Sequence, residues 1–171
     1  MNTTGNENIA IGDGALYNNT TGSNNIGIGR ISGTDSLVNI TTQSNYAVFG
    51  NNSTTNAVVK VAWTVGSDAR DKTNFAPVPH GLEFVNELQP TAFEYKKNRE
   101  SDEPQTDGRL RYGFLAQDIL ALEGESAVIV DNRDPEHLKV TETSLIPVLV
   151  KAIQELSAEL TTVKAELAKL K

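Results

Sequence analysis

A serine and a lysine stand five residues apart near the middle of the chain, in the segment Gly66-Ser67-Asp68-Ala69-Arg70-Asp71-Lys72. A serine hydroxyl becomes a nucleophile when a neighbouring base removes its proton, and a neutral lysine amine can be that base. An ordinary lysine has a pKa of about 10.4, and bringing this value near 7 costs about 4 kcal/mol of differential solvation. Burial or a nearby positive charge supplies such a shift, and Arg70 is a candidate for the charge.

The five-residue spacing limits how the two side chains can meet. On a helix, residues five apart point about 140° away from each other, and on a strand they lie on opposite faces. Ser67 and Lys72 can therefore meet only across a bend, or between neighbouring subunits. Because a serine followed five residues later by a lysine is a common pattern, the spacing alone is weak evidence for catalysis. A solvated linker of mixed charge is the alternative interpretation.

Four blocks that begin at this serine, in a fixed order, resemble a known family. The blocks are Ser67-Asp68-Ala69-Arg70-Asp71-Lys72, Leu88-Gln89-Pro90-Thr91-Ala92-Phe93-Glu94-Tyr95-Lys96, Tyr112-Gly113-Phe114-Leu115-Ala116-Gln117-Asp118 and Leu145-Ile146-Pro147-Val148-Leu149-Val150-Lys151-Ala152-Ile153-Gln154-Glu155-Leu156. Together they resemble the C-terminal intramolecular chaperone domain of phage tailspikes and tail fibres. This self-cleaving domain is known from endosialidase tailspikes and from a membrane-bound animal transcription factor.

The resemblance implies a cleavage site. In the family a serine and a lysine form a dyad, and the bond that breaks lies just before the serine. Carried over to this chain, the bond is Gly66–Ser67, with Ser67 as the nucleophile and Lys72 as the base. The implied activity is that of a single-turnover autoproteolytic serine peptidase.

Four further residues are candidates for supporting this dyad: Asp68, Arg70, His80 and Gln117. His80 is a candidate third polar group at the site. Gln117 can either orient a polar group there or make a capping interaction at the start of a helix, and the second role is the commoner one.

Composition excludes several other functions. The chain has 171 residues, no cysteine, a net charge of −7 and 38% hydrophobic residues, which is a small apolar content for a self-sufficient core. Since no basic cluster could follow a phosphate backbone, we expect no nucleic-acid partner. We expect no membrane partner either, because no apolar run is long enough to span a bilayer. Without a thiolate, and with no carboxylate placed to join His80 or His137, we assign no metal and no cofactor.

Residues 1–66 contain an internal repeat. The segment from Thr3 to Gly12 recurs from Thr20 to Gly29 with seven of ten residues identical, 17 positions later. A fixed period with turn residues between short alternating strands predicts stacked β-structure, in which neighbouring coils or chains cover the isoleucines. The repeats resemble the head repeats of trimeric adhesins and some phage fibres; a disordered polar tail is the alternative. Further strands are expected at 37–40, 46–49 and 57–63, and the repeat beginning so soon after Met1 suggests a piece of a longer protein.

Residues 67–145 predict a mixed α+β domain. We expect a short helix over 82–88, strands at 91–95 and 110–115, a helix over 116–122, and a pair of strands at 126–130 and 138–140. The charged stretch 96–109, with Pro104 and Gly108, predicts a surface loop or the tip of a hairpin. In the family, protruding hairpins of this kind grip the fibre that is being folded.

From Ile146 to the C-terminus, apolar residues follow a heptad pattern with alternating spacings of three and four. This pattern predicts a parallel coiled coil of about 37 Å, with charged pairs between Glu159 and Lys164 and between Glu166 and Lys171 of neighbouring chains. A helix that folds back on its own domain is the alternative. The expected core residues are Ile146, Leu149, Ile153, Leu156, Leu160, Val163, Leu167 and Leu170.

The expected organisation is therefore a β-structured fibre end at 1–66, an α+β chaperone and autoprotease at 67–145, and a coiled-coil helix at 146–171. The resemblance implies three chains, so the first partner is the protein itself, as a homotrimer. The second is its own upstream fibre, and the third is a host surface receptor bound by the mature fibre. The chaperone would act in the infected bacterial cytoplasm and be released, leaving the fibre on the virion. Two alternatives remain: a non-catalytic trimerisation cap and a receptor-binding tip.

Overall fold

The computed structural model describes residues 2–99, 101–103, 105–124 and 127–170. Contacts divide the chain into two compact units, Met1–Thr64 and Val65–Lys171. Three expectations concern positions outside the described residues: Pro104 in the charged loop, Ser126 at the start of a strand, and Lys171 as an interchain partner. Among the described residues, no helix is both long and apolar enough to cross a lipid bilayer.

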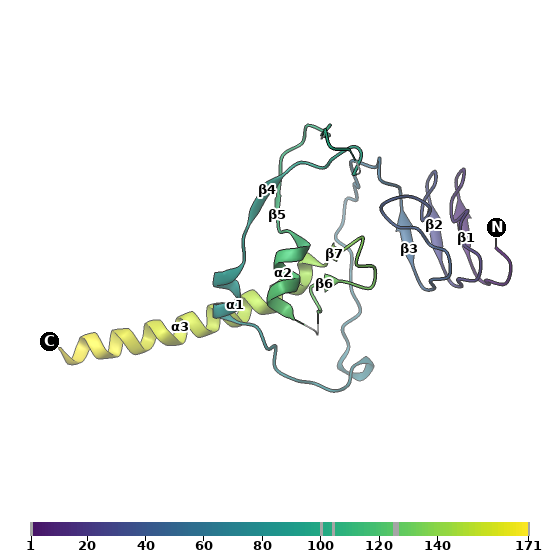
Figure 1. The fold of residues 1–171 in the computed structure, drawn as a ribbon. Coiled ribbons are helices and arrows are strands. Elements are labelled where there is room, and N and C mark those ends of the chain that lie inside the picture. The colour runs from purple at the N-terminus through teal and green to yellow at the C-terminus, as the bar shows by residue number, and fades with distance from the viewer. Residues whose placement is uncertain (1, 100, 104, 125–126, 171) are drawn as a thin grey trace. The chain divides into compact units, whose positions relative to one another are not determined.

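The first unit is a stack of three parallel strands. The strands β1 (Ile9–Ile11), β2 (Ile26–Ile28) and β3 (Ala47–Phe49) lie side by side in sequence order (Figure 1). Ile9 pairs with Ile26, and Ile26 with Ala47, so equivalent positions of successive turns are in register. Each strand ends at a glycine with a positive φ, of 123°, 120° and 80° at Gly12, Gly29 and Gly50, a conformation that glycine adopts without strain.

The third turn of this stack is a copy of the repeat that the sequence analysis missed. The segment 41–50 aligns with 20–29 and keeps five residues of ten, Thr41, Thr42, Ser44, Asn45 and Gly50, but its separation is 21 positions instead of 17. The additional residues form a turn at 35–38, closed by a bridge between Thr34 and Asn39. This bridge replaces the strand that was expected at 37–40.

A buried asparagine joins all three turns. Asn25, with none of its surface exposed, donates its backbone N–H to Asn8 Oδ1 at 3.0 Å. Its side chain donates to the Gln43 carbonyl at 2.9 Å and accepts the Tyr46 N–H at 3.0 Å. These bonds satisfy backbone groups that would otherwise be buried without partners.

The larger apolar side chains of the strands point away from the interior of the first unit. The buried apolar side chains described there are Leu16, Ile40 and Val48, whereas Ile11 and Phe49 are each 59% exposed. Strands that carry apolar residues on both faces are typical of sheets that are covered on both sides.

Residues 57–63 do not form a strand, so that expectation is wrong for the single chain. All residues from Asn52 to Pro77 are exposed, and Trp63 touches only the ring of Phe49 among the described aromatic contacts, at 6.3 Å between centroids. The segment keeps the alternating apolar pattern of a strand, but within one chain its backbone finds no neighbouring strand with which to pair.

The second unit is the expected α+β domain. Two hairpins are formed by the antiparallel pairs β4 (Thr91–Phe93) with β5 (Arg111–Gly113), and β6 (Val130–Asp131) with β7 (Lys139–Val140). The first hairpin extends through a bridge between Lys96 and Thr106, as the loop-or-tip interpretation allowed. The strands expected at 126–130 and 138–140 are confirmed only as two-residue pieces.

Three α-helices complete the second unit: α1 (Leu82–Glu87), α2 (Ala116–Glu123) and α3 (Leu145–Lys169), with short 3-10 turns at Ala69–Asp71 and Glu142–Ser144. The core is built from one side of each helix and the second hairpin. Its buried members are Phe84, Leu88, Ile119, Ile129, Val130, Leu145 and Val148. The Glu123 carboxylate accepts the backbone N–H groups of 128, 129 and 130, which ties α2 to β6.

The predicted long helix is confirmed as α3. One face of this helix is buried against its own domain, and another face is exposed. Its N-terminal turns pack on α1 through Leu145, Val148 and Ala152, all at most 5% exposed. After Glu155 every described residue is exposed, and the helix extends beyond the rest of its unit (Figure 1). The eight expected coiled-coil residues are all 43% or more exposed. The alternative interpretation, a helix that folds back on its own domain, therefore holds only for the first turns of α3.

We expect Asn25→Ala to lower the free energy of unfolding of the first unit by about 2–4 kcal/mol, since it leaves two buried backbone groups without partners at about 1–3 kcal/mol each. Asn18→Ala is the matched control, because Asn18 is exposed and donates to the exposed side chain of Asn39, so we expect a loss below about 0.5 kcal/mol. Hydrogen exchange of the backbone amides of β1 to β3 in the full chain, at increasing urea concentration, measures both. Equal losses in the two variants would contradict the assignment of Asn25.

Candidate functional site

The segment between Ser67 and Lys72 forms a single tight turn. Asp68 caps it by accepting the Arg70 N–H at 2.9 Å. The Lys72 N–H then donates to the Ala69 carbonyl at 3.2 Å. An aspartate favours this place because its short carboxylate reaches the free N–H groups at the start of a turn. The turn is the bend that the spacing of Ser67 and Lys72 requires.

Across this turn the two side chains meet. Lys72 Nζ donates to Ser67 Oγ at 2.5 Å, within one chain. Both residues are exposed. In this arrangement the heavy atoms of a nucleophile and its base are in hydrogen-bond reach, but the amine is the donor. A general base must instead accept the hydroxyl hydrogen, which needs the neutral form of the amine.

The structure pairs Arg70 with Asp68 rather than with a group at the dyad. Arg70 Nη2 lies 2.6 Å from Asp68 Oδ2, and Arg70 Nε also donates to the same carboxylate. The Arg70 side chain, followed by its backbone N–H, lowers the pKa of Asp68, and Asp68 in turn raises the pKa of Arg70. Because an adjacent carboxylate largely cancels the guanidinium charge, Arg70 is a poor source of the positive charge that would favour a neutral lysine.

Gly66, on the other side of the candidate bond, stands in open space. A Cβ built there would meet no atom within 4 Å. The whole stretch from 52 to 77 is exposed, so the bond Gly66–Ser67 is accessible in the single chain. An accessible bond with a nucleophile beside it lacks one ingredient of catalysis, a site from which water is excluded.

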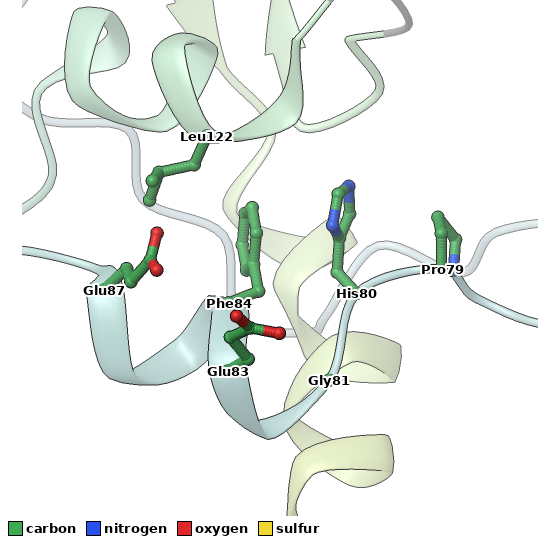
Figure 2. Close-up of a pocket in the computed structure, with 7 residues that line it drawn as sticks. All are labelled: Pro79, His80, Gly81, Glu83, Phe84, Glu87 and Leu122. Atoms are coloured by element: carbon green, nitrogen blue, oxygen red, sulfur yellow. The ribbon is translucent and has the colours of Figure 1, made fainter.

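His80 lies in a pocket of about 220 Å³ that Ser67 and Lys72 do not line. Its ring stacks on Phe84, with centroids 4.2 Å apart and planes inclined by 31°. Figure 2 shows Leu122 reaching from α2 toward α1, which carries Phe84, Glu83 and Glu87, with His80 beside Phe84. The contacts of His80 are thus those of a packing residue, and its role at the dyad remains a prediction.

Gln117 does not cap a helix, which corrects the expectation for this residue. It is exposed on the first turn of α2, and no side-chain hydrogen bond caps that helix, whose N-cap residue is Leu115. Instead, the N–H groups of Asp118 and Ile119 donate to the Leu115 carbonyl. The alternative role, at the dyad, stays untested.

Among the residues that the structure describes, no three His, Cys, Asp or Glu side chains are grouped as they would be around a metal ion. His137 pairs with the carboxylate of Asp134 at 2.9 Å and lowers the pKa of Asp134. This pair lies in the turn between β6 and β7, and its geometry is that of a hydrogen-bonded pair at the surface.

Sequence reasoning missed two residues of α3 that contact the chain just downstream of the dyad. Lys151 and Glu155 bond the backbone at 78–82. In the heptad pattern both residues fall outside the two core positions, so the pattern assigns them no contact. The available signal was their position beside Val148 and Ala152, which lie off the coiled-coil stripe and are apolar.

We expect the Asp68 carboxyl to titrate below its ordinary value of 3.8 and to move back toward that value in Arg70→Gln, because the hydrogen bonds from Arg70 favour the charged form. A lowered pKa means that the contribution of this pair to the turn is present above the unfolded pKa and is lost as pH falls through the lower folded value. Carbon-detected NMR titration of the full chain measures both midpoints. An Asp68 midpoint that Arg70→Gln leaves unchanged would contradict the pairing.

Comparison with known proteins adds one finding. Residues 67–129 match a family described as "Chaperone of endosialidase", whose label is that of a peptidase family. No curated protein and no solved structure matches the chain. The match begins at Ser67 and leaves out both the β-stack and α3. The match supports a C-terminal intramolecular chaperone domain that includes residues 67–129.

Proposed function

We propose that residues 67–171 bring three copies of a phage tail fibre into register and then cut themselves from it at Gly66–Ser67. The observation that carries this proposal is the contact of Lys72 Nζ with Ser67 Oγ, at the first residue of the family match. In this proposal residues 1–66 are the end of the fibre, 67–145 the chaperone and autoprotease, and 146–171 a trimeric coiled coil. No metal or cofactor takes part.

The exposed stripe of α3 supports the association of copies. Ile153, Leu156 and Leu160 are 66%, 53% and 51% exposed, yet their heptad spacing is that of a coiled-coil core. A stripe of this kind is unfavourable in water, and full burial of such a side chain is worth about 1.5–3 kcal/mol. Three in-register copies would cover it along its whole length.

Residues 1–66 also have exposed apolar surfaces that other copies of the chain could cover. The outward faces of β1 to β3 are apolar, and the alternating segment 57–63 has no strand beside it. In a trimer the same surfaces of the other two copies supply both the covering face and the missing strands. Such interchain β-structure forms slowly, because its contacts are non-local. A helix whose contacts are local can align the chains first.

The proposed chemistry is an acyl transfer within one peptide unit. Ser67 Oγ attacks the carbonyl carbon of Gly66, and Lys72 Nζ takes the hydroxyl proton. The Gly66–Ser67 C–N bond breaks, an ester forms between Gly66 and Ser67 Oγ, and the proton passes from Lys72 to the departing amine. Water then hydrolyses the ester, which gives a carboxylate at Gly66 and restores the Ser67 hydroxyl.

Assembly is the proposed switch for this reaction. In the single chain, Lys72 is exposed to water and its amine donates to Ser67 Oγ. Packing of neighbouring copies over the exposed segment would exclude this water and favour the neutral amine, which can accept a proton. Cleavage then follows correct assembly, and release of the chaperone makes unfolding of the fibre hard to reverse.

The alternatives belong to other classes of protein. A non-catalytic trimerisation cap keeps the helix and the stack but never breaks the bond. A receptor-binding tip stays attached and contacts the host surface. Mass spectrometry separates them from the proposal, since cleavage at Gly66 divides 171 residues into fragments of 66 and, as 171 minus 66, 105 residues. A wild-type chain that stays intact after long incubation under assembling conditions would refute self-cleavage.

We expect Ser67→Ala to abolish cleavage and Lys72→Ala to slow it by about 10² to 10⁴-fold, the usual contribution of a positioned base. Both chains should still form trimers, because neither side chain touches the core or the stripe. Lys169→Ala is the matched control, since it removes an exposed lysine away from the dyad. Denaturing electrophoresis over time, with sedimentation of the same samples, gives both readouts. Normal cleavage in either dyad variant would remove that residue from the mechanism.

We also expect cleavage to depend on protein concentration. Below the concentration at which trimers dissociate, the rate should fall in proportion to the trimer fraction, because only assembled chains exclude water from Lys72. A dilution series read by mass spectrometry, beside a sedimentation series, measures the relation. Equally fast cleavage by monomers would break the proposed link between assembly and chemistry.

A further inference from the structure

Two charged side chains tie α3 to the backbone just downstream of the dyad. Lys151 Nζ donates to the carbonyls of Val78 at 2.8 Å and Pro79 at 3.3 Å. Glu155 Oε2 accepts the Leu82 N–H at 2.6 Å, at the start of α1. These contacts connect residues more than 70 positions apart in the sequence.

The polarity of each contact is specific. Lys151 meets backbone carbonyls, which need a donor, and Glu155 meets a backbone N–H, which needs an acceptor. The two side chains also lie 3.6 Å apart as an ion pair, and they are only 34% and 41% exposed. Gly81 completes the arrangement, because a Cβ at this position would collide with the Glu155 carboxylate. We call Lys151, Glu155 and the backbone of 78–82 the clamp.

The clamp residues lie on a different side of α3 from the exposed apolar stripe that is proposed to bind other copies. Counting from Ile146 as the first core position, Lys151 and Glu155 fall at heptad positions f and c, away from the a and d stripe. Their neighbours Val148 and Ala152 are 3% and 4% exposed and pack on the domain. The helix can therefore hold the clamp on one side and other copies on another.

The clamp also limits the distance between the dyad and the start of α3. Every residue from 52 to 77 is exposed, and Val78 is the first partly buried residue after the dyad. Five residues lie between Lys72 and Val78, so the six steps along the chain reach at most about 20–22 Å. Fixing α3 therefore limits the distance of Lys72 from the first turns of this helix to about that length.

We propose that Lys151 and Glu155 are positioning residues for self-cleavage. They transmit the placement of α3 in the assembly to the segment that carries the dyad. This inference rests on the proposed function, since it concerns the efficiency of the same reaction. Neither side chain touches the reacting atoms. Without the clamp, trimers form but the dyad is held less often where neighbouring copies can cover it.

The test compares cleavage and assembly in full-length variants. We expect Lys151→Met and Glu155→Gln each to slow cleavage at least tenfold at equal trimer fraction, measured by sedimentation. Lys151→Arg keeps the donor and should stay within about threefold of the wild type. Lys169→Met, a lysine outside the clamp, should not change the rate. Hydrogen exchange of residues 78–88, in a Ser67→Ala background that stays intact, should become faster in the two clamp variants.

A charge exchange separates positioning from simple helix stabilisation. The double variant Lys151→Glu with Glu155→Lys restores an ion pair four residues apart on α3, which stabilises a helix. It also places an anion against two carbonyls and a cation against an N–H. We therefore expect it to cleave as slowly as the single variants. A merely structural ion pair would be rescued.

Three outcomes would overturn the inference. The first is normal cleavage in Lys151→Met and Glu155→Gln while the wild type cleaves, which leaves the proposed function standing. The second is slowing that only follows a loss of trimer, or rescue by the charge exchange. The third is a wild-type chain that never cleaves, which removes the proposed function together with the clamp's role in it.

Discussion

The packing of α3 against α1 is the interaction on which the second unit depends. Within two turns the helix buries Leu145, Val148 and Ala152 in its own domain, while Ile146, Leu149 and Ile153 remain 58%, 43% and 66% exposed. Each side chain of the second set gains on the order of 1 kcal/mol from further burial, before the entropic cost of association. The helix thus has one face that organises the domain and another whose stability depends on something outside the chain.

The first unit obtains its order from hydrogen bonds more than from an apolar core. Its fully buried side chains include Asn19, Asn25 and Ser32, beside a core of only Leu16, Ile40 and Val48. Buried polar groups of this kind specify one register, because a slip of the stack by one residue would leave them unpaired. Such a network fixes the arrangement of the turns but leaves the outer faces of the strands without cover. The two units therefore share a property, a precise internal arrangement combined with exposed apolar surface.

Most of the elements could be predicted from periodicity, and the failures have specific physical causes. The heptad spacing predicted α3, and the repeat predicted β1 and β2. The third turn was hidden because its separation grew to 21 and because Tyr46 replaces the asparagine found at Asn25. Residues 57–63 have the composition of a strand, but pairing depends on a neighbour that no local pattern reveals. The clamp was missed because a charged residue bonded to a distant backbone looks, in sequence, like any residue on a solvated helix face.

At the candidate site, the sequence predicted how Ser67 and Lys72 can meet, but it did not predict the charged partner of Arg70. A five-residue separation left a bend or a contact between subunits as the two possibilities, and the Asp68-capped turn brings the pair together within one chain. The identity of the partner of Arg70 depended on which carboxylate the turn would bring near it, and spacing could not decide this.

Proximity and reactivity are separate requirements at Ser67, and the chain meets only the first by itself. A turn of six residues is sufficient to bring Nζ to Oγ, so no assembly is needed for contact. The whole stretch 52–77 is exposed to water, however, and no described residue covers the pair. In the proposed mechanism, contact between the two side chains is therefore not sufficient for cleavage. The missing requirement is desolvation, and the surfaces that could supply it belong to the same apolar faces that a single chain leaves exposed. In the proposed function, association with the other copies therefore both activates the pair and covers the exposed apolar faces.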